Sequence, residues 1–534
     1  MNKPIKSPWL ADIAAFLPIP LVYFGLCLIY IRLIVSYATS GIDPEFNYLF
    51  NGILLSHLKF HLNAIGHPGT PIQVLIAVVS RVIHLFRPGG TLWDDVILNP
   101  DIYIRSVLYT AAVINASVLF FTGRFMYRKT GSLIASLIIQ LTPFAFVLTL
   151  EESNRMMPEL IMPSIICLWI ILLIKVLKND DSRYPLLFGL LASFSLSDKL
   201  TFIPFVFLPM FLIQGAKSKL NYMGWLIVSF LVFAFPVMFN SHKFITWVTD
   251  LFTHKGVYGS GEKGIIDWNT FVNNLRFILG NTIQILIPVA FLIVLTVYMA
   301  LSGKIKKRAI YLVAGLIFVF ALQYAITAKH FAFYYLTPTL LMAVFAGYLV
   351  YELLKGTLRP AILKWLPEVL LLVFGIMLLV INVPKVVHQL NDMAERKSIK
   401  QEAFLKFEPI LKNSPRIIAP DYFGCSSPEY ALMFGLHESG RYNKIVLAEI
   451  EKHYPGTTFY LEWGDIYYKW NAEIAAEKVM ERGRLYTLLI KGYTEDKLRK
   501  IVTSLSGDTT ADVKVTMLAE SKETNEAAFS IIKY

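Results

Sequence analysis

Long apolar segments separated by short polar loops fill the first 384 residues of the chain. Eleven of them predict membrane-spanning helices. We expect these spans at residues 10–37, 103–123, 131–150, 159–177, 184–197, 200–215, 221–240, 276–302, 309–327, 331–354 and 365–383. The fifth and sixth are shorter than the roughly 20 residues that normally cross a bilayer. Since they meet at the polar Ser197–Lys199, we expect two short helices joined by a turn.

A further apolar stretch, from Pro71 to Phe86, interrupts the long polar segment 38–102. It carries Arg81 and His84 and is too short to span comfortably, so its pattern predicts a helix lying in the membrane interface.

The pattern changes after residue 384 to the charge density of a soluble domain. Residues 416–419 and 485–490 predict buried strands, and residues 495–505 have the apolar spacing of a helix. We therefore predict a polytopic α-helical membrane domain of about 11 transmembrane helices, residues 1–384, followed by a small soluble α/β domain, residues 385–534.

Composition supports this division. Of the 534 residues, 55% are hydrophobic and 16% charged, which excludes a soluble enzyme. The net charge of +12 lies wholly in the first 384 residues, which carry 29 basic and 17 acidic side chains. Such an excess reflects cytoplasmic loops and anionic lipid headgroups, so we expect no nucleic-acid partner. The three cysteines are too scattered to indicate a disulfide framework or a cysteine metal site.

Basic clusters also predict the orientation in the membrane. If the amino terminus is cytoplasmic, each cluster falls in a cytoplasmic loop. The clusters are Arg124/Arg128/Lys129, Lys175/Lys178/Arg183, Lys217/Lys219, Lys304/Lys306/Lys307/Arg308 and Lys355/Arg359/Lys364. An odd number of spans then places the carboxy-terminal domain outside the cytoplasm. We expect an integral protein of the bacterial inner (plasma) membrane.

Carboxylates recur in two of the predicted outer loops. Asp43 and Glu45 follow the first span, and the sequence from Glu151 to Glu159 separates the third from the fourth. Helix capping could explain the carboxylates of each loop separately, with Asp43 as the N-cap residue before Pro44. Several carboxylates at one membrane face are nevertheless costly unless their charge is paired or used.

Cationic side chains occur on the same face. Lys199 lies at the turn between the fifth and sixth spans, Lys329 and His330 lie between the ninth and tenth, and Arg105 begins the second. A lysine at a helix end can extend to the headgroups or bind a phosphate, and the sequence leaves both readings open. His330 is equally an interface residue or a ligand.

The order of these features resembles that of the GT-C glycosyltransferases, the polytopic enzymes that include the protein O-mannosyltransferases and the lipid A aminoarabinose transferases. The matching segments, in chain order, are Asp43-Pro44-Glu45, His67-Pro68, Arg105, Pro158-Glu159, Ser197 to Thr201 and Lys329 to Pro338. The likeness covers residues 1–384. It departs from the family pattern at Gly69, where a second proline is commoner, and at Glu159, where aspartate is frequent.

The resemblance implies an integral-membrane glycosyltransferase that moves a hexose or pentose from a polyprenyl-phosphate donor to an acceptor on the outer face. The acceptor can be a glycan, a lipid or a protein. A carboxylate would take the proton of the acceptor hydroxyl as it attacks the anomeric carbon. Asp43 is the expected catalytic base, with Glu45 beside it. The resemblance also implies substrate contacts from His67, Arg105, Glu159, Lys199, Lys329, His330 and Tyr335, the cations among them neutralising the leaving phosphate.

Three points stay open at this stage. We expect catalysis without a metal, the alternative being a divalent ion held by Glu45, Glu159 and His330, although no close-spaced ligand motif is present. The glycine-rich sequence from His254 to Glu262 is either a mobile lid or a plain connection. The alternative function is that of a transporter or flippase of lipid-linked sugars, which requires charge within the spans rather than at their outer ends.

Overall fold

The structure, a computed structural model, describes residues 9–40, 42–87, 89–178, 183–357, 365–411, 415–421, 424–506 and 513–534. Its contacts divide the chain into two compact units, neither continuous in sequence. Unit 1 contains the residues up to Ile29, Ile65–Ile72 and Tyr109–Val387; unit 2 contains Tyr30–Ala64, Gln73–Leu108 and His388–Tyr534. The sheet domain thus shares its unit with two early segments, and the predicted boundary between residues 384 and 385 stays a prediction.

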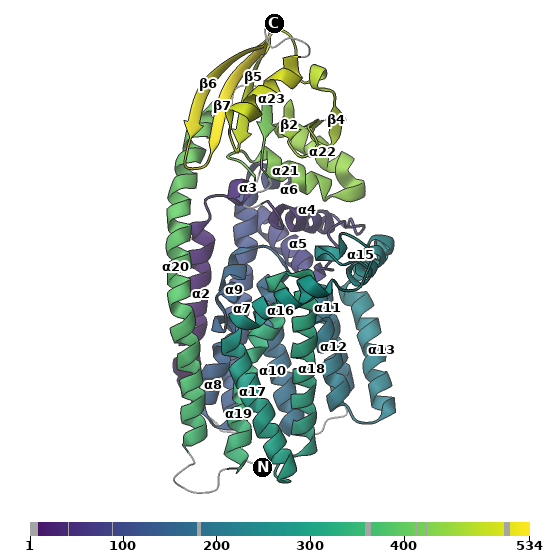
Figure 1. Ribbon diagram of the computed structural model, residues 1–534, viewed down its shortest axis with the longest axis vertical. Coiled ribbons are helices and arrows are strands. Elements are labelled where there is room, and N and C mark those ends of the chain that lie inside the picture. Colours follow the sequence, from purple (N-terminus) through teal and green to yellow (C-terminus); the bar gives the residue numbers. More distant parts are fainter. Residues whose placement is uncertain are drawn as a thin grey trace. The chain divides into compact units, whose positions relative to one another are not determined.

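Helices make up most of the described chain before residue 411 (Figure 1). The α-helices are α1 (Trp9–Phe16), α2 (Pro18–Leu33), α3 (Tyr37–Ser40), α4 (Glu45–Ser56), α5 (Thr70–Leu85), α6 (Leu92–Leu98), α7 (Pro100–Thr130), α8 (Leu133–Gln140), α9 (Val147–Glu151), α10 (Met162–Lys178), α11 (Tyr184–Asp198), α12 (Ile203–Leu212), α13 (Ala216–Phe233), α14 (Phe235–Phe239), α15 (Ser241–Thr253), α16 (Trp268–Asn281), α17 (Ile283–Leu301), α18 (Lys307–His330), α19 (Thr337–Thr357) and α20 (Leu366–Leu411). Short 3₁₀ turns connect several of them: η1 (Thr142–Phe144), η2 (Glu152–Asn154), η3 (Pro158–Ile161), η4 (Leu200–Phe202), η5 (Val257–Gly259) and η6 (Phe333–Leu336).

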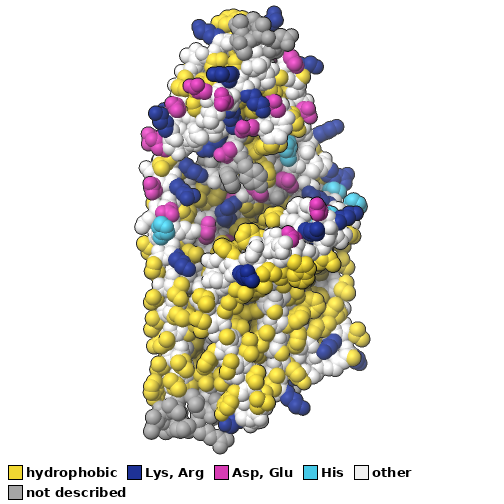
Figure 2. Space-filling view, viewed as in Figure 1, with side chains coloured by type: hydrophobic (Ala, Val, Ile, Leu, Met, Phe, Trp, Pro, Cys, Tyr) yellow, Lys and Arg dark blue, Asp and Glu magenta, His cyan; other side chains and the backbone are white. Residues whose placement is uncertain are grey.

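Six helices in the described ranges are long and apolar enough to cross a membrane, and the bent pair α1 and α2 would add a seventh. They are Pro100–Thr130, Pro158–Lys178, Ile283–Leu301, Lys307–His330, Phe333–Gly356 and Leu366–Leu411. The chain is therefore an integral membrane protein, and Figure 2 shows hydrophobic side chains covering the helices of unit 1. The predicted count of eleven is not confirmed. The predicted span 131–150, for example, is broken after Gln140, where η1 contains Pro143.

Within unit 1, helices distant in sequence pack side by side: α11 against α13, α12 against α18, and α17 against α19. Gly189 allows the first of these contacts, since a Cβ atom there would lie 2.6 Å from the Trp225 side chain. The packing brings the end of α11, the end of α18 and the start of α10 into one buried region. Two 3₁₀ turns belong to this region: η3, which leads directly into α10, and η6, which leads into α19.

A seven-stranded mixed sheet forms the carboxy-terminal part of unit 2, in the order β4-β3-β2-β1-β5-β7-β6. The strands are β1 (Arg416–Ala419), β2 (Thr457–Leu461), β3 (Ile466–Lys469), β4 (Ala472–Ile474), β5 (Leu485–Lys491), β6 (Val513–Ser521) and β7 (Glu526–Lys533). β1 runs parallel to β2 and β5, and the other pairs are antiparallel. The two strands predicted from the sequence, β1 and β5, are confirmed as central neighbours.

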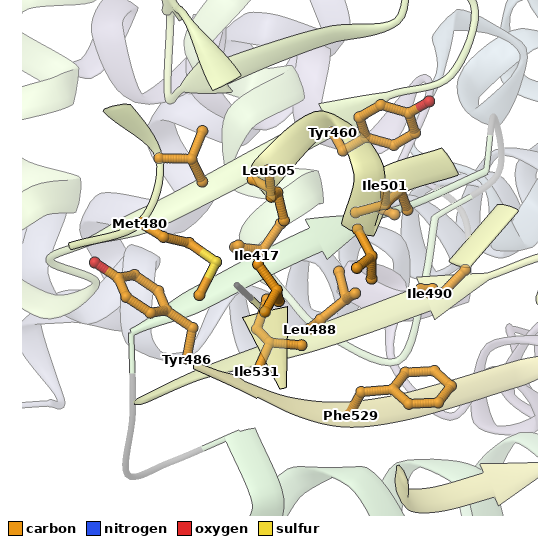
Figure 3. Packing of buried hydrophobic residues seen from close by; sticks show 14 of the residues in the cluster. Ile417, Tyr460, Met480, Tyr486, Leu488, Ile490, Ile501, Leu505, Phe529 and Ile531 are labelled. Carbon is orange, nitrogen blue, oxygen red and sulfur yellow. The ribbon is translucent and has the colours of Figure 1, made fainter. Parts of the chain in front are cut away.

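Helices cover both faces of this sheet. The predicted helix 495–505 is confirmed as α23 (Glu495–Ser506), and its Ile501 and Leu505 pack on Ile417 and Leu488 of the strands (Figure 3). On the other face lie α21 (Glu429–His437) and α22 (Asn443–His453), with the Tyr430 ring 6.4 Å from that of Phe459. An α/β domain is thus present at the end of the chain, as expected.

Candidate active site

A buried ion pair lies where the end of α11 meets the start of α10. Lys199 follows α11 directly and pairs with Glu159 of η3, and the two side chains are 4% and 0% exposed. The Lys199 ammonium also lies 4.3 Å from the centroid of the Tyr334 ring, within cation–π distance. Lys199 therefore points into the protein and does not extend to the lipid headgroups.

Two more carboxylates are buried beside this pair. The Thr337 hydroxyl donates a hydrogen bond of 2.8 Å to Oε1 of Glu152, whereas Oε2 has no protein partner. Asp198 is 0% exposed, and neither of its oxygens has a protein partner. Glu152 and Asp198 each interact electrostatically with Glu159. The cluster therefore contains three carboxyl groups and one lysine.

His67 is held between aromatic rings in the same unit. Its ring lies 4.6 Å from that of Trp247 on α15 and 5.8 Å from that of Tyr335 on η6. Gly66 permits this contact, because a Cβ atom there would lie 3.2 Å from Trp247. The Gly69 N–H donates to the Asp198 carbonyl oxygen at 3.1 Å, which ties the His67 loop to the end of α11.

The histidine is neutral in this position. Burial, together with the charges of Lys199 and His330, holds the pKa of His67 well below its usual value. A neutral imidazole has one N–H donor and one acceptor nitrogen. Both ring nitrogens of His67 are buried without a protein partner, so each is left for a ligand or a water molecule.

His330 and Tyr335 complete the group in unit 1. Their rings lie 5.7 Å apart, and the Tyr335 hydroxyl is buried without a protein partner. The loop after α15 reaches the same place, since the Tyr258 ring lies 6.3 Å from that of Tyr335. This loop is a hairpin whose ends are joined by an antiparallel bridge between His254 and Lys263. Both interpretations of this loop, a mobile lid and a plain connection, stay predictions.

Lys329 has a different environment from Lys199. Its ammonium donates to the carbonyl oxygens of Leu251 and Phe252 at the end of α15, at 2.6 and 3.3 Å. It also lines a cavity of about 330 Å³ together with Lys255 and Thr270. Lys329 thus fixes α15, the helix that carries Trp247.

The other three predicted residues belong to unit 2. The Arg105 guanidinium donates to the carbonyl oxygens of Ile31, Ile34 and Val35 at 2.6–3.0 Å, so it closes the end of α2. Glu45 is fully buried at the first position of α4. Asp43 precedes it and is exposed.

Asp43 is not the N-cap that the sequence suggested. The residue at that position of α4 is Pro44, which makes no side-chain capping bond.

The structure thus groups six predicted residues in unit 1, namely His67, Glu159, Lys199, Lys329, His330 and Tyr335, and three in unit 2, namely Asp43, Glu45 and Arg105. In the described part of the chain no group of three His, Cys, Asp or Glu side chains could hold a metal ion. Metal-free catalysis and the alternative of a divalent ion held by Glu45, Glu159 and His330 both stay predictions.

Glu152, Asp198 and Trp247 belong to the cluster but were not chosen from the sequence as site residues. The first two lie in motifs that the sequence did single out, the acidic loop after the third predicted span and the polar turn at Ser197–Lys199. Nothing in the pattern around Trp247 distinguishes it from the other tryptophans, because its place depends on where α15 packs.

Comparison with known proteins gives one family match. Residues 96–239 match the family described as dolichyl-phosphate-mannose-protein mannosyltransferase. This segment contains Arg105, Glu159 and Lys199, and it confirms the resemblance to the GT-C glycosyltransferases. No curated protein matches the chain in sequence. Among solved structures, ArnT from Cupriavidus metallidurans bound to undecaprenyl phosphate is similar over 96% of this chain and 97% of its own, with 10% identity and a TM-score of 0.48.

Proposed function

We propose that this protein is an integral-membrane glycosyltransferase that transfers a sugar from a polyprenyl-phosphate donor to an acceptor on the outer face of the membrane. The observation that carries the proposal is the buried cluster of Glu152, Glu159, Asp198, Lys199 and His67, whose polar atoms are only partly satisfied within the protein. Buried ionisable groups inside a membrane protein are costly and mark sites of function. Four of the five, Glu152, Glu159, Asp198 and Lys199, lie in the segment that matches the family.

The chemistry follows from these side chains. The leaving group of the donor is a phosphate, so a nearby cation stabilises the charge that develops on it. Lys199 is the proposed cation, with Lys329 as a second candidate. The attacking hydroxyl needs a base, and Asp43 is proposed for that role. The resemblance to the GT-C glycosyltransferases implies a single displacement, which would invert the anomeric centre.

The helices of unit 1 also offer room for a lipid chain. A cavity of about 240 Å³ lies between α17, α19 and α20, lined by apolar side chains such as Phe291, Val350 and Phe374. A polyprenyl tail is a flexible hydrocarbon that such a cavity suits. The cavity therefore supports a lipid-linked donor.

The test is transfer by the purified protein in liposomes, using a panel of polyprenyl-phosphate hexoses and pentoses with a radiolabelled sugar. We expect the native chain to release polyprenyl phosphate and label an acceptor, and Asp43→Asn to lose about 10²-fold or more in turnover. Asp392→Asn, at an aspartate 47% exposed on α20, is the matched control and should turn over normally.

A flippase gives a different result in the same liposomes. It would move the intact donor between leaflets without releasing its sugar, and Asp43→Asn would move it as well as the native chain. Transfer of sugar at the native rate by Asp43→Asn would instead assign the base to another carboxylate, such as Glu45.

A further inference from the structure

The last residue of α11 carries a buried carboxylate with nothing in the protein to bind it. Asp198 is 0% exposed and both of its oxygens are without a partner. A carboxyl group has two oxygens that accept hydrogen bonds and, when protonated, one O–H donor as well. Leaving all of these hydrogen bonds unmade in a buried place is strongly unfavourable, so the position calls for hydrogen-bond donors from outside the chain.

The neighbouring charges decide which kind of ligand fits. The charges that act on Asp198 are those of Glu159 and Lys199, and the Lys199 ammonium already pairs with Glu159. Lys199 is therefore already engaged, and the cluster of Glu152, Glu159, Asp198 and Lys199 holds three carboxyl groups against one ammonium group. A phosphate would be repelled from this carboxylate, whereas neutral hydroxyl groups can donate to both of its oxygens.

Other unsatisfied polar atoms lie in the same region. The Tyr335 hydroxyl and Oγ1 of Thr201 are buried without partners, on residues 2% and 4% exposed, and both ring nitrogens of His67 are unpartnered too. The Tyr335 ring lies 5.8 Å from the His67 ring, and the Gly69 N–H holds the His67 loop to the Asp198 main chain. Donors and acceptors together complement a ligand that bears several hydroxyl groups.

We propose that Asp198 is the centre of a subsite for the hydroxyl groups of the donor sugar, and that it sets which sugar is accepted. The two carboxylate oxygens bind a pair of neighbouring hydroxyl groups on the sugar ring, and Tyr335 and His67 bind others. This inference rests on the proposed function. It adds that the site recognises the donor by the hydroxyl groups of its sugar. Such a subsite discriminates against deoxy sugars, which lack one of the hydroxyl groups that it binds.

The experiment compares a polyprenyl-phosphate sugar that has all its hydroxyl groups with analogues in which one hydroxyl at a time is replaced by hydrogen. In the native protein, kcat/KM should fall about 10- to 150-fold for the analogue that lacks a bound hydroxyl, the value of a charge-assisted hydrogen bond. In Asp198→Asn the full donor should lose a similar factor, and the variant should hardly distinguish it from that analogue.

Two further variants separate this role from a structural one. Ser197→Ala changes the adjacent buried residue, whose hydroxyl donates to the Phe194 carbonyl oxygen, and should discriminate like the native chain. Tyr335→Phe removes only an unpartnered hydroxyl and should lose part of the discrimination. Thermal unfolding of Asp198→Asn should be unchanged or raised, because the change removes a buried carboxyl group that has no partner in the protein.

The possible failures are distinct. If the native chain transfers sugar while Asp198→Asn and Tyr335→Phe discriminate as sharply as it does, the subsite is disproved and the proposed function stands. A lowered unfolding temperature of Asp198→Asn with discrimination intact would make Asp198 a structural acid and overturn the inference in the same way. Absence of transfer from every donor by the native chain would overturn both.

Discussion

At the scale of single residues, two lysines at helix ends in similar sequence settings have different roles. Lys199 is buried against Glu159 and Tyr334, whereas Lys329 donates to carbonyl oxygens at the end of α15. Each follows an apolar run, so the pattern leaves headgroup contact and phosphate binding open for both. Only the packing of η3 and η6 around the end of α11 separates them.

The Lys199–Glu159 pair should depend on both of its members. Glu159→Gln leaves a buried ammonium without its counter-charge, and losing one partner of a buried pair typically costs about 3–5 kcal/mol. We expect a clear drop in the temperature of thermal unfolding in detergent, largely recovered in the double variant with Lys199→Met. Glu352→Gln, which breaks the partly exposed pair with Lys178, should cost at most about 1 kcal/mol. Additive losses in the double variant would contradict this account.

Residue types and order were enough to predict part of the site. His67, Glu159, Lys199, His330 and Tyr335 were all chosen from the sequence, and the structure groups them in unit 1. Their roles stay predictions. The aromatic contact of Trp247 with His67 could not be predicted, because the two residues are 180 positions apart and no local pattern links them.

At the scale of elements, apolar content predicted where helices form better than it predicted which helices are long enough to span a membrane. Strands β1 and β5 and helix α23 appear where the pattern placed them. The predicted spans at 131–150 and 200–215 contain shorter helices, because averaged hydropathy ignores the prolines and polar groups that end them. Pro143 and Pro204, for example, lie at or near the starts of η1 and α12.

Helix α6 offers a test by pH. Hydrogen bonds from the hydroxyl and N–H of Thr91, with a third from His453, hold the pKa of Asp94 below its usual value. Since the folded pKa is depressed, the stabilisation is present above about pH 4 and is lost as the pH falls through the folded value. We expect amide hydrogen exchange in α6 to keep its protection down to about pH 4 and to lose it as the pH falls further.

The matched variant for this test is Asp94→Asn, which has no carboxylate to titrate. Its α6 should be less protected at pH 6, by about 1 kcal/mol for a lost capping contact, and should change little further on acidification. Equal pH profiles in the native chain and the variant would show that another group controls the exchange of α6.

At the scale of the whole molecule, long-range contacts define units that no segment of sequence reveals. The side chains of Asn51 and Asn63 donate to Glu438, and Gly435 packs on the Phe50 ring, so α4 belongs with α21 although nearly 400 residues separate them. The shift in composition after residue 384 indicates the sheet domain, but it does not indicate that α4 packs with α21.

The predicted orientation can be tested by cysteine labelling across the membrane. We expect cysteines at Ser218 to be labelled from the cytoplasm, and those at Ser260 and Thr503 from outside. The native cysteines Cys27, Cys167 and Cys425 are all buried, so the unmodified chain is a control with a low background. Labelling of Ser260 from the cytoplasm would contradict an outer position for the loop beside Tyr335.

The sheet of unit 2 ends in a strand that is poorly suited to pair with another molecule. β6 lies at one edge, and its register with β7 shifts between Met517 and Ala519. An irregularity of this kind bends the strand and interrupts the row of free N–H and C=O groups on which a second sheet would build. Met517 and Leu518, 47% and 46% exposed, lie at this point, where two apolar side chains on a flat edge would otherwise invite aggregation. The shift therefore disfavours edge-to-edge pairing between the sheets of two molecules.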